Sequence, residues 1–159
     1  MNLTVQKYSK INKSSRKTRL AAADKWFSIY IRLRDSKQGV IRCITCNSIK
    51  SWRNIDCGHY QKRSKMSTRY DEENCHAQCR ACNQYHSGRD DIFARNIDLK
   101  CGAGTAETLR IKAKKLKKYT NIELYLIEQE YREKALILAE SKVIQLWNHI
   151  KLYSLQAGS

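Results

Sequence analysis

The stretch that decides the fold runs from Cys43 to His86 and reads CITCNSIKSWRNIDCGHYQKRSKMSTRYDEENCHAQCRACNQYH. It begins with one C-x-x-C pair, Cys43 and Cys46, and nearly ends with another, Cys79 and Cys82. A thiolate needs either a soft metal or a disulfide partner, and two such pairs on either side of one polar segment are typical of a single tetrahedral zinc ion. The sequence therefore predicts a structural Zn²⁺ site, with a disulfide scaffold as the alternative.

Cysteine usage favours the metal over the disulfides. The chain has 7 cysteines among 159 residues, an odd number. It shows no apolar run like a signal peptide and no stretch of about 18 apolar residues that could cross a membrane. We therefore expect a reducing compartment, and we expect Cys57, Cys75 and Cys101 to be buried small hydrophobic residues.

The charge is both large and uneven. The formal net charge is +16. Residues 1–70 contain 17 Lys and Arg against 3 Asp and Glu, whereas residues 71–159 contain 14 against 12. Because such an excess repels itself unless a polyanion neutralises it, the composition predicts a nucleic-acid partner. A merely soluble basic protein is the alternative.

The length fits one domain with helical extensions, and the patterns predict an α+β core. We expect a flexible basic arm over residues 1–17 and a core over residues 18–104. The core begins with an amphipathic helix from about Thr18 and continues with a short strand over Val40–Arg42. Residues 61–70 are predicted to form a polar loop that lies on a phosphate backbone.

Residues 105–159 are predicted to form a basic helical tail. A helix capped by Thr105 is expected to reach about Tyr119, and Thr120 is expected to cap a last helix that runs to roughly Trp147. Apolar residues nearly encircle that last helix, so it belongs either to the core or to a dimer surface. The residues expected to contact nucleic acid are Lys62, Arg63, Lys65, Arg69, Lys112 and Lys115.

The polar residues between and after the two cysteine pairs fit phosphodiester hydrolysis. That reaction needs an activated water and a divalent ion at the scissile phosphate. Histidine titrates near neutral pH, so His59 is the candidate base. Hard cations such as Mg²⁺ or Mn²⁺ prefer oxygen ligands, which Asp56 and Asn83 offer, and His86 could be a further ligand. The amide of Asn74 could fix the loop that carries His59.

Each of these assignments has a structural alternative. His59 could be a polar surface residue, Asn83 a helix-entry cap and Asn74 only a turn residue. Asp56 could pair with Arg53 rather than bind a metal, and His86 could be exposed or contact a DNA phosphate. His76 has no clear functional role, and we expect it to be structural.

The motifs of this stretch resemble those of the HNH, or ββα-metal, nucleases, and more narrowly the NinG/Rap family of phage recombination endonucleases. The residues that carry the resemblance are CITC from Cys43, DCGHY from Asp56, EN at Glu73–Asn74 and QCRACNQYHSG from Gln78. The preceding helix and the tail to about residue 150 match more loosely.

The resemblance implies a zinc-stabilised HNH-like core and a structure-selective DNA endonuclease that resolves branched intermediates, including Holliday junctions. It places His59 at the general-base position, Asn74 at the middle Asn, and Asn83 at a position for the catalytic divalent ion. It also assigns Cys43, Cys46, Cys79 and Cys82 to zinc. Symmetric cutting needs two active sites, so we expect a homodimer. A phage-encoded enzyme of this kind would act in the cytoplasm of the bacterial host.

One position departs from the wider HNH pattern. Many HNH enzymes have a carboxylate or histidine immediately before the base, where this chain has Gly58. Asp56 is the nearest substitute. Two other functions fit part of the pattern: a non-catalytic zinc-finger adaptor that binds DNA, and an HNH endonuclease that reads sequence.

Overall fold

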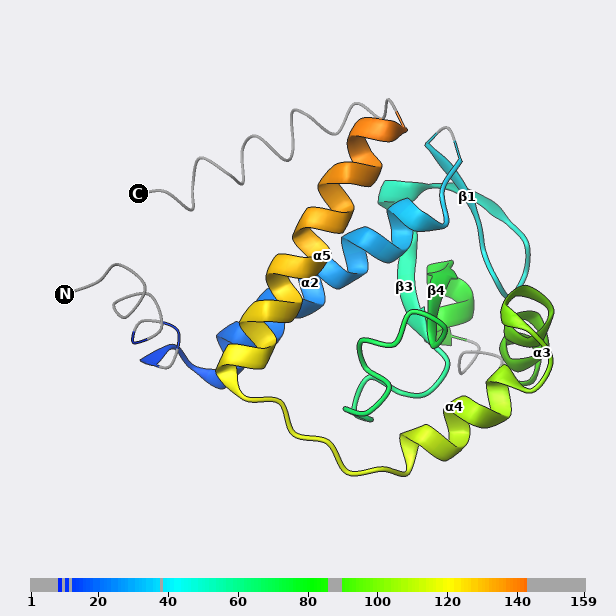
Figure 1. Cartoon of the computed structure of the whole chain (residues 1–159). Coiled ribbons are helices and arrows are strands. Elements are labelled where there is room, and N and C mark those ends of the chain that lie inside the picture. Colours follow the sequence, from blue (N-terminus) through cyan, green and yellow to red (C-terminus); the bar gives the residue numbers. More distant parts are fainter. Residues whose placement is uncertain (1–8, 10, 12, 38, 86–89, 143–159) are drawn as a thin grey trace.

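The computed structural model describes residues 9, 11, 13–37, 39–85 and 90–142 (Figure 1). The chain combines helices with two small antiparallel sheets, which makes the fold a mixed α/β arrangement. None of the helices within the described ranges is both long and apolar enough to span a membrane. The elements in chain order are α2 (Arg16–Arg34), β1 (Val40–Arg42), β2 (Ile49–Ser51), the short 3₁₀ helix η1 (Trp52–Asn54), β3 (Asp56–His59), β4 (Cys75–Gln78), the short π-helix η2 (Ala81–Tyr85), α3 (Asp90–Cys101), α4 (Thr105–Ala113) and α5 (Asn121–Ser141).

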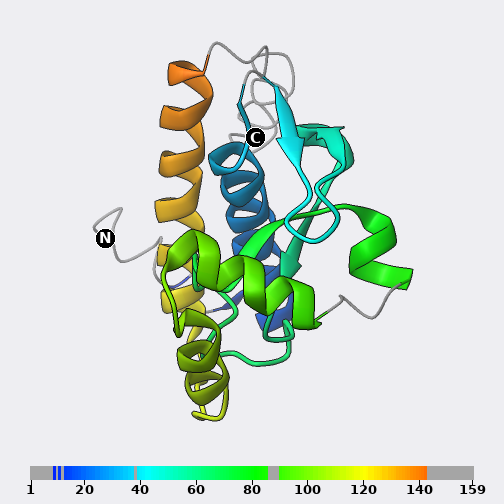
Figure 2. The ribbon, with the colours of Figure 1, turned by 90° about the vertical axis from the view of Figure 1, so that its right-hand side faces the viewer.

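Two long helices, α2 and α5, lie side by side in both views (Figures 1 and 2). Each begins with a side-chain cap. Ser15 accepts a hydrogen bond from the backbone N–H of Thr18, and Thr120 forms a reciprocal capping box with Glu123. The apolar faces of α2 and α5 pack into one hydrophobic cluster, which includes Phe27 of α2. The last helix is therefore a core element, as one of the two alternatives predicted.

Strands β3 and β4 form the sheet that matters for function. They pair antiparallel with Asp56 opposite Gln78 and His59 opposite Cys75. All four residues of β4 are buried. The sequence patterns did not predict β4. Its four residues, CHAQ, include none of the β-branched or aromatic residues that are enriched in strands.

Helices α3 and α4 meet at a glycine-rich corner. Gly102 and Gly104 have φ of 115° and 85°, a conformation that favours glycine, so they end α3. Thr105 is the first residue of α4 rather than its cap. The expectation that α4 reaches Tyr119 was wrong, because it ends at Ala113. The next residues read KKLKKY, and a run of like charges with a fully exposed Leu116 offers no apolar face to bury.

Both ends of the helical part differ from, or extend beyond, what the sequence predicted. Helix α2 begins at Arg16, two residues before the expected start, and Ile11 is buried at 6% exposure. The segment predicted as a basic arm thus contributes one side chain to the core. The predicted extension of the last helix to Trp147, like His86, lies outside the described residues.

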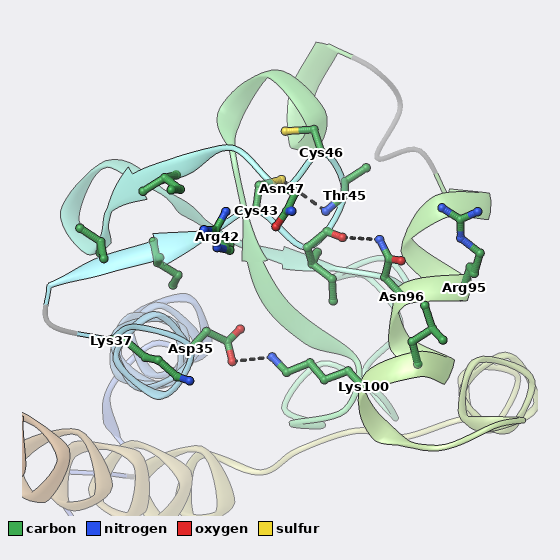
Figure 3. Close-up of a pocket in the computed structure, with 15 residues that line it drawn as sticks. Asp35, Lys37, Arg42, Cys43, Thr45, Cys46, Asn47, Arg95, Asn96 and Lys100 are labelled. Carbon is green, nitrogen blue, oxygen red and sulfur yellow. Dashed lines mark hydrogen bonds and ion pairs between the residues drawn. The ribbon is translucent and has the colours of Figure 1, made fainter.

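A buried carboxylate joins α2 to β4. Asp35, at the C-terminal cap of α2, accepts hydrogen bonds from the backbone N–H of Ala77 (2.9 Å), from Arg34 Nε (2.9 Å) and from Lys100 Nζ (2.9 Å), the last of which is drawn in Figure 3. His76 Nδ1 lies 3.5 Å from the same carboxyl group. Burial alone would raise the pKa of Asp35, but the hydrogen bonds from His76 and Arg34 hold it well below its usual range. The group therefore stays ionised.

Removing the Asp35 carboxylate should destabilise the fold. Asp35→Ala leaves Arg34, Lys100 and the Ala77 N–H without their shared acceptor, and we expect a loss of about 3 kcal/mol in the free energy of unfolding. The matched control is Lys117→Ala, which removes an exposed ion pair with Glu123 and should cost at most about 0.5 kcal/mol. Urea denaturation of both variants measures the difference, and equal losses would contradict the role given to Asp35.

Candidate metal centre and catalytic cavity

The four cysteines of the two C-x-x-C pairs, each pair here called a knuckle, converge on one point. The sulfur atoms of Cys43, Cys46, Cys79 and Cys82 all lie within 4.8 Å of one another, and the Sγ atoms of Cys46 and Cys79 are 3.6 Å apart. A tetrahedral Zn²⁺ ion with Zn–S bonds near 2.3 Å requires sulfur separations of about 3.8 Å. The cluster therefore fits a zinc ion, as the sequence predicted, and the cysteines are not joined by disulfides.

The surroundings of the cluster favour thiolates. The backbone N–H groups of Thr45 and Cys79 both point at Cys43 Sγ, at 3.4 and 3.3 Å (the former is drawn in Figure 3). Burial opposes ionisation of Cys46, but interactions with Ser48 and the neighbouring sulfurs outweigh it and lower the pKa of Cys46 to about 6. Burial raises the pKa of Cys82. A bound cation would compensate the charge of the remaining thiolates.

Two hydrogen bonds fasten the first knuckle to the rest of the core. The backbone N–H of Ile44 donates to Ala77 O at 2.9 Å, which ties the knuckle to β4. The side-chain amide of Asn96, on α3, donates to Ile44 O (Figure 3). The first knuckle is therefore held between β4 on one side and α3 on the other.

Three of the residues predicted for catalysis or ion binding line one cavity. A hollow of about 840 Å³ is lined by Asp56, His59 and Asn83, together with Lys62 and Arg63 at its basic side. Asn83 Nδ2 donates to Asp56 Oδ2 at 3.0 Å, so these two candidate ion ligands touch each other. The alternative that Asn83 is only a helix cap is disfavoured, because its side chain bonds β3 rather than its own helix.

The ring of His59 is held from both sides. Its Nε2 lies 3.1 Å from Arg69 O, and its Nδ1 lies 3.3 Å from Cys57 O. Burial, with a smaller contribution from the positive charge of Arg63, lowers the pKa of His59 to about 4. The imidazole is therefore neutral at pH 7, with one nitrogen carrying a proton and the other a free lone pair.

Asn74 organises the loop between β3 and β4. Its side chain is fully buried, accepts a hydrogen bond from the N–H of Gln61 (2.7 Å), and donates to Gln61 O (3.0 Å) and Thr68 O (2.9 Å). These bonds close the loop whose Arg69 carbonyl faces His59. Asn74 thus fixes the loop as the sequence predicted, and it acts by positioning rather than by touching the cavity.

Close packing against a neighbouring side chain explains why residue 58 is a glycine. A Cβ at residue 58 would lie 2.7 Å from the Cβ of Gln78 and in collision with its Oε1. Gln78 is 1% exposed, lines the cavity, and donates through Nε2 to Thr45 Oγ1 at 2.8 Å. The space that a side chain at position 58 would need is therefore occupied by an amide from the opposite strand. Sequence reasoning missed Gln78, because only the β3–β4 register brings it next to Asp56.

The predicted DNA-contacting residues divide into two groups. Lys62, Arg63 and Lys65 are exposed, and the first two line the cavity. Arg69 does not fit the prediction, because it is 8% exposed and forms a two-point ion pair with Asp24 on α2. Its guanidinium holds the loop in place and is not available to a phosphate.

The two predicted DNA-contacting residues of the tail lie outside the His59 cavity. Lys112 and Lys115 line a separate hollow of about 560 Å³ beside Leu116 and Tyr119. Lys112 also forms an ion pair with Asp71 at 2.5 Å. Phosphate contact by these two lysines stays a prediction.

A second large hollow lies at the first cysteine pair and shares no lining residue with the His59 cavity. It measures about 810 Å³ and lies between β1, the first knuckle and α3 (Figure 3). Lys37, Arg42 and Arg95 line it, and none of the three has a carboxylate partner within the part of the chain that the structure describes. This surface adds three cations that the sequence analysis did not single out.

The comparisons with known proteins agree with the motif pattern. The family described as Bacteriophage Lambda NinG protein matches residues 3–140. The chain belongs to the NinG family. Protein ninG of Salmonella phage P22 is 30% identical over 139 residues, and protein ninG of Escherichia phage lambda is 29% identical over 140 residues. Each match covers 84% of this chain and 65% of the relative, so the chain spans slightly less than two thirds of those NinG proteins.

A third relative matches over a shorter part of the chain. Protein ninG of Escherichia phage 933W is 36% identical over 85 residues, which are 50% of this chain and 39% of that protein. No solved structure matches the chain. The resemblance to the NinG family is therefore confirmed.

Loss of one knuckle cysteine should release the zinc. Cys79→Ser removes one of four sulfurs, and we expect the purified variant to lose its tightly bound zinc and to unfold at lower urea concentration. Cys101→Ser is the control, since Cys101 lies on α3 outside the cluster. Metal analysis of both proteins measures the zinc content, and retention of tight zinc by Cys79→Ser would contradict the assignment.

Acid should destabilise the fold partly through His59. The pKa of His59 is about 4 in the fold and about 6.5 in an unfolded chain. Between these values the unfolded chain binds more protons, so the free energy of unfolding falls as the pH falls from about 6.5 to about 4. His59→Gln cannot take up this proton and should lose less stability than the wild type between pH 7 and pH 4.5 in urea titrations. Acid loss of zinc affects both proteins alike, so equal losses would count against the low pKa.

Proposed function

We propose that this NinG-family chain is a metal-dependent endonuclease that cleaves branched DNA, including four-way junctions. The observation that carries the proposal is the single cavity that gathers His59, Asp56 and Asn83 next to Lys62 and Arg63. A base, oxygen ligands for a hard cation and basic side chains for the phosphate are the parts that phosphodiester hydrolysis needs. The site of action would be the cytoplasm of a bacterial host.

His59 is suited to act as the general base. Its Nε2 lies at hydrogen-bond distance from Arg69 O, which favours the tautomer with the proton on Nε2 and the lone pair on Nδ1. Because its pKa is about 4, the ring is unprotonated at neutral pH. In the proposed mechanism Nδ1 takes a proton from a water molecule, and the resulting hydroxide attacks phosphorus in line. The 3′ oxygen departs, leaving 5′-phosphate and 3′-hydroxyl ends.

The oxygen atoms beside His59 fit a hard divalent ion. Asp56 and Asn83 would hold Mg²⁺ or Mn²⁺, whose positive charge stabilises the negative charge that develops on the phosphate and on the leaving oxygen. Since Asn83 Nδ2 donates to Asp56, its Oδ1 would be the atom that binds the ion. The side-chain amide of the buried Gln78 lies where a side chain at position 58 would be. His86 stays a predicted ligand outside the described residues.

The order of the strands and the short helix around the cavity supports an HNH-like core. Strands β3 and β4 are followed directly by the short helix η2, which begins at the second cysteine pair and carries Asn83. This order of strand, strand and helix is the one that a ββα-metal core would have. The proposed core would comprise residues 18–104, with the helical tail after it.

A branched substrate fits the distribution of positive charge. The cavity carries Lys62 and Arg63, the knuckle hollow carries Lys37, Arg42 and Arg95, and the tail hollow carries Lys112 and Lys115. Three separate basic surfaces could each hold a duplex arm, and binding should then fall steeply with salt. Symmetric cutting would require a homodimer, for which the exposed Leu126 and Ile137 of α5 offer an apolar surface.

One observation favours the non-catalytic alternative, a zinc-stabilised DNA-binding adaptor. Both ring nitrogens of His59 lie within 3.3 Å of backbone carbonyl oxygens, which also suits a purely structural histidine. The adaptor shares the basic charge and the cysteine cluster but needs no base. Cleavage therefore separates the two functions.

Removing the base should abolish cleavage without loss of binding. We expect His59→Ala to nick a four-way junction at least about 100-fold more slowly than the wild type in Mg²⁺ or Mn²⁺, with zinc content and junction affinity unchanged. The control is Glu107→Ala, which breaks an exposed ion pair with Arg110 and should cleave normally. Gel assays with a junction and with a linear duplex of the same sequence measure both rate and branch preference.

The outcomes of this assay distinguish the functions. Cleavage by His59→Ala at the wild-type rate would remove the base assignment. Cleavage by a chelator-treated, Mg²⁺-free sample would remove the role of the ion. Binding of junctions without any cleavage by the wild type would favour the adaptor, and equal cleavage of junction and linear duplex would favour a nuclease that is not selective for branches.

A further inference from the structure

A second group of soft donor atoms surrounds His59. The Sγ atoms of Cys57 and Cys75 and a ring nitrogen of His59 all lie within 4.8 Å of one another. Cys57 and His59 are two residues apart on β3, and Cys75 is the direct partner of His59 on β4. Because side chains alternate along a strand and paired residues share a face, all three project from the same face of the sheet. That face packs against α2, where Phe27 contacts the His59 ring.

The three donors match the preferences of a thiophilic cation. Two thiolates and one imidazole are a common ligand set for Zn²⁺ in a tetrahedral site that leaves one position open. The group shares no residue with the four-cysteine cluster. It is also reachable, because Cys57 and His59 both line the His59 cavity. Bringing the donors to the separations of a zinc site requires movements of about 1 Å.

Without a metal, the buried Cys75 thiol would keep its proton. Cys57 and Cys75 are 5% and 0% exposed, and burial raises the pKa of Cys75 well above its usual value. A cation that binds there must displace both thiol protons to solvent, which makes this site weaker than the knuckle cluster. Two thiolates balance the charge of one divalent ion, so the bound state would bury no net charge.

We propose that Cys57, Cys75 and His59 form a second, inhibitory binding site for a thiophilic divalent cation such as Zn²⁺ or Cd²⁺. Binding of the cation does not depend on the proposed nuclease function, whereas the inhibition rests on it. Mg²⁺ does not compete, because it avoids sulfur ligands.

Inhibition follows whichever ring nitrogen binds the cation. Coordination through Nδ1 uses the lone pair that would accept the proton from water. Coordination through Nε2 displaces the proton that this nitrogen shares with Arg69 O, and the neutral ring must then carry its proton on Nδ1. In both cases His59 is lost as a base.

The first experiment counts metal ions on the full-length chain. Dialysis against buffers of rising free Zn²⁺, followed by metal analysis, should give one tightly bound equivalent and then a second, weaker one. Cadmium NMR of the Cd²⁺-loaded protein should likewise show two resonances, one from a four-sulfur site and one from a site with two sulfurs and a nitrogen. A wild type that stops at one equivalent overturns the proposal without any variant.

Variants assign the second equivalent. Cys57→Ala and Cys75→Ala should each lose it and keep the first, with the fold checked by circular dichroism. Cys101→Ala is the matched control, because Cys101 is a free thiol near a different imidazole, 3.9 Å from His76 Nε2. Retention of two equivalents by either strand variant, or loss of the second by Cys101→Ala, would place the ion elsewhere and overturn the assignment.

The second experiment tests the inhibition. In constant Mg²⁺, free Zn²⁺ that fills the weaker site should lower junction nicking by the wild type at least tenfold, while Cys75→Ala should be resistant. Equal inhibition of both proteins overturns the inhibitory role. If the wild type never nicks DNA, the proposed function fails, and the metal count still decides whether the cation site exists.

Discussion

The antiparallel pairing of β3 with β4 is the constraint on which the rest depends. Its register places His59 opposite Cys75 and Asp56 opposite Gln78, and a slip of one residue would turn every one of these side chains to the other face. One end of β4 leads directly into the second cysteine pair. The other end leads back to the loop closed by Asn74. A ladder of eight residues therefore connects the metal cluster, the cavity and the loop that holds the histidine.

This small ladder cannot bury enough surface to be stable alone, so it is held from outside. Helix α2 covers one face with Phe27 and its neighbours, and α5 completes that apolar cluster. Asp35 at the end of α2 bonds the backbone of β4, and Ile44 in the first knuckle bonds the same residue, Ala77, through its carbonyl. Both backbone groups of Ala77 are thus taken by neighbouring elements, which leaves β4 little freedom to shift.

Local pattern was enough to predict part of the structure. The two C-x-x-C pairs predicted the cluster of four cysteines, and the helical periodicity from about Thr18 predicted α2, because each C-x-x-C pair and each helical repeat is a signal within a few residues of sequence. The pairing that brings Gln78 against Gly58, and the ion pair of Arg69 with Asp24, link residues far apart in the chain. No local pattern encodes such contacts, so Gln78 was missed and Arg69 was taken for a phosphate contact. The geometry around His59 depends on the same long-range register.

The contact between Gly58 and Gln78 has a consequence for how this fold can diversify. A carboxylate or histidine could enter position 58 only in a chain that replaces Gln78 with a smaller residue, because both side chains would claim the same volume on neighbouring strands. The two positions should therefore change together across descendants of this sequence. A protein engineer who wishes to transplant an acidic ligand in front of the histidine would have to exchange both residues in a single step.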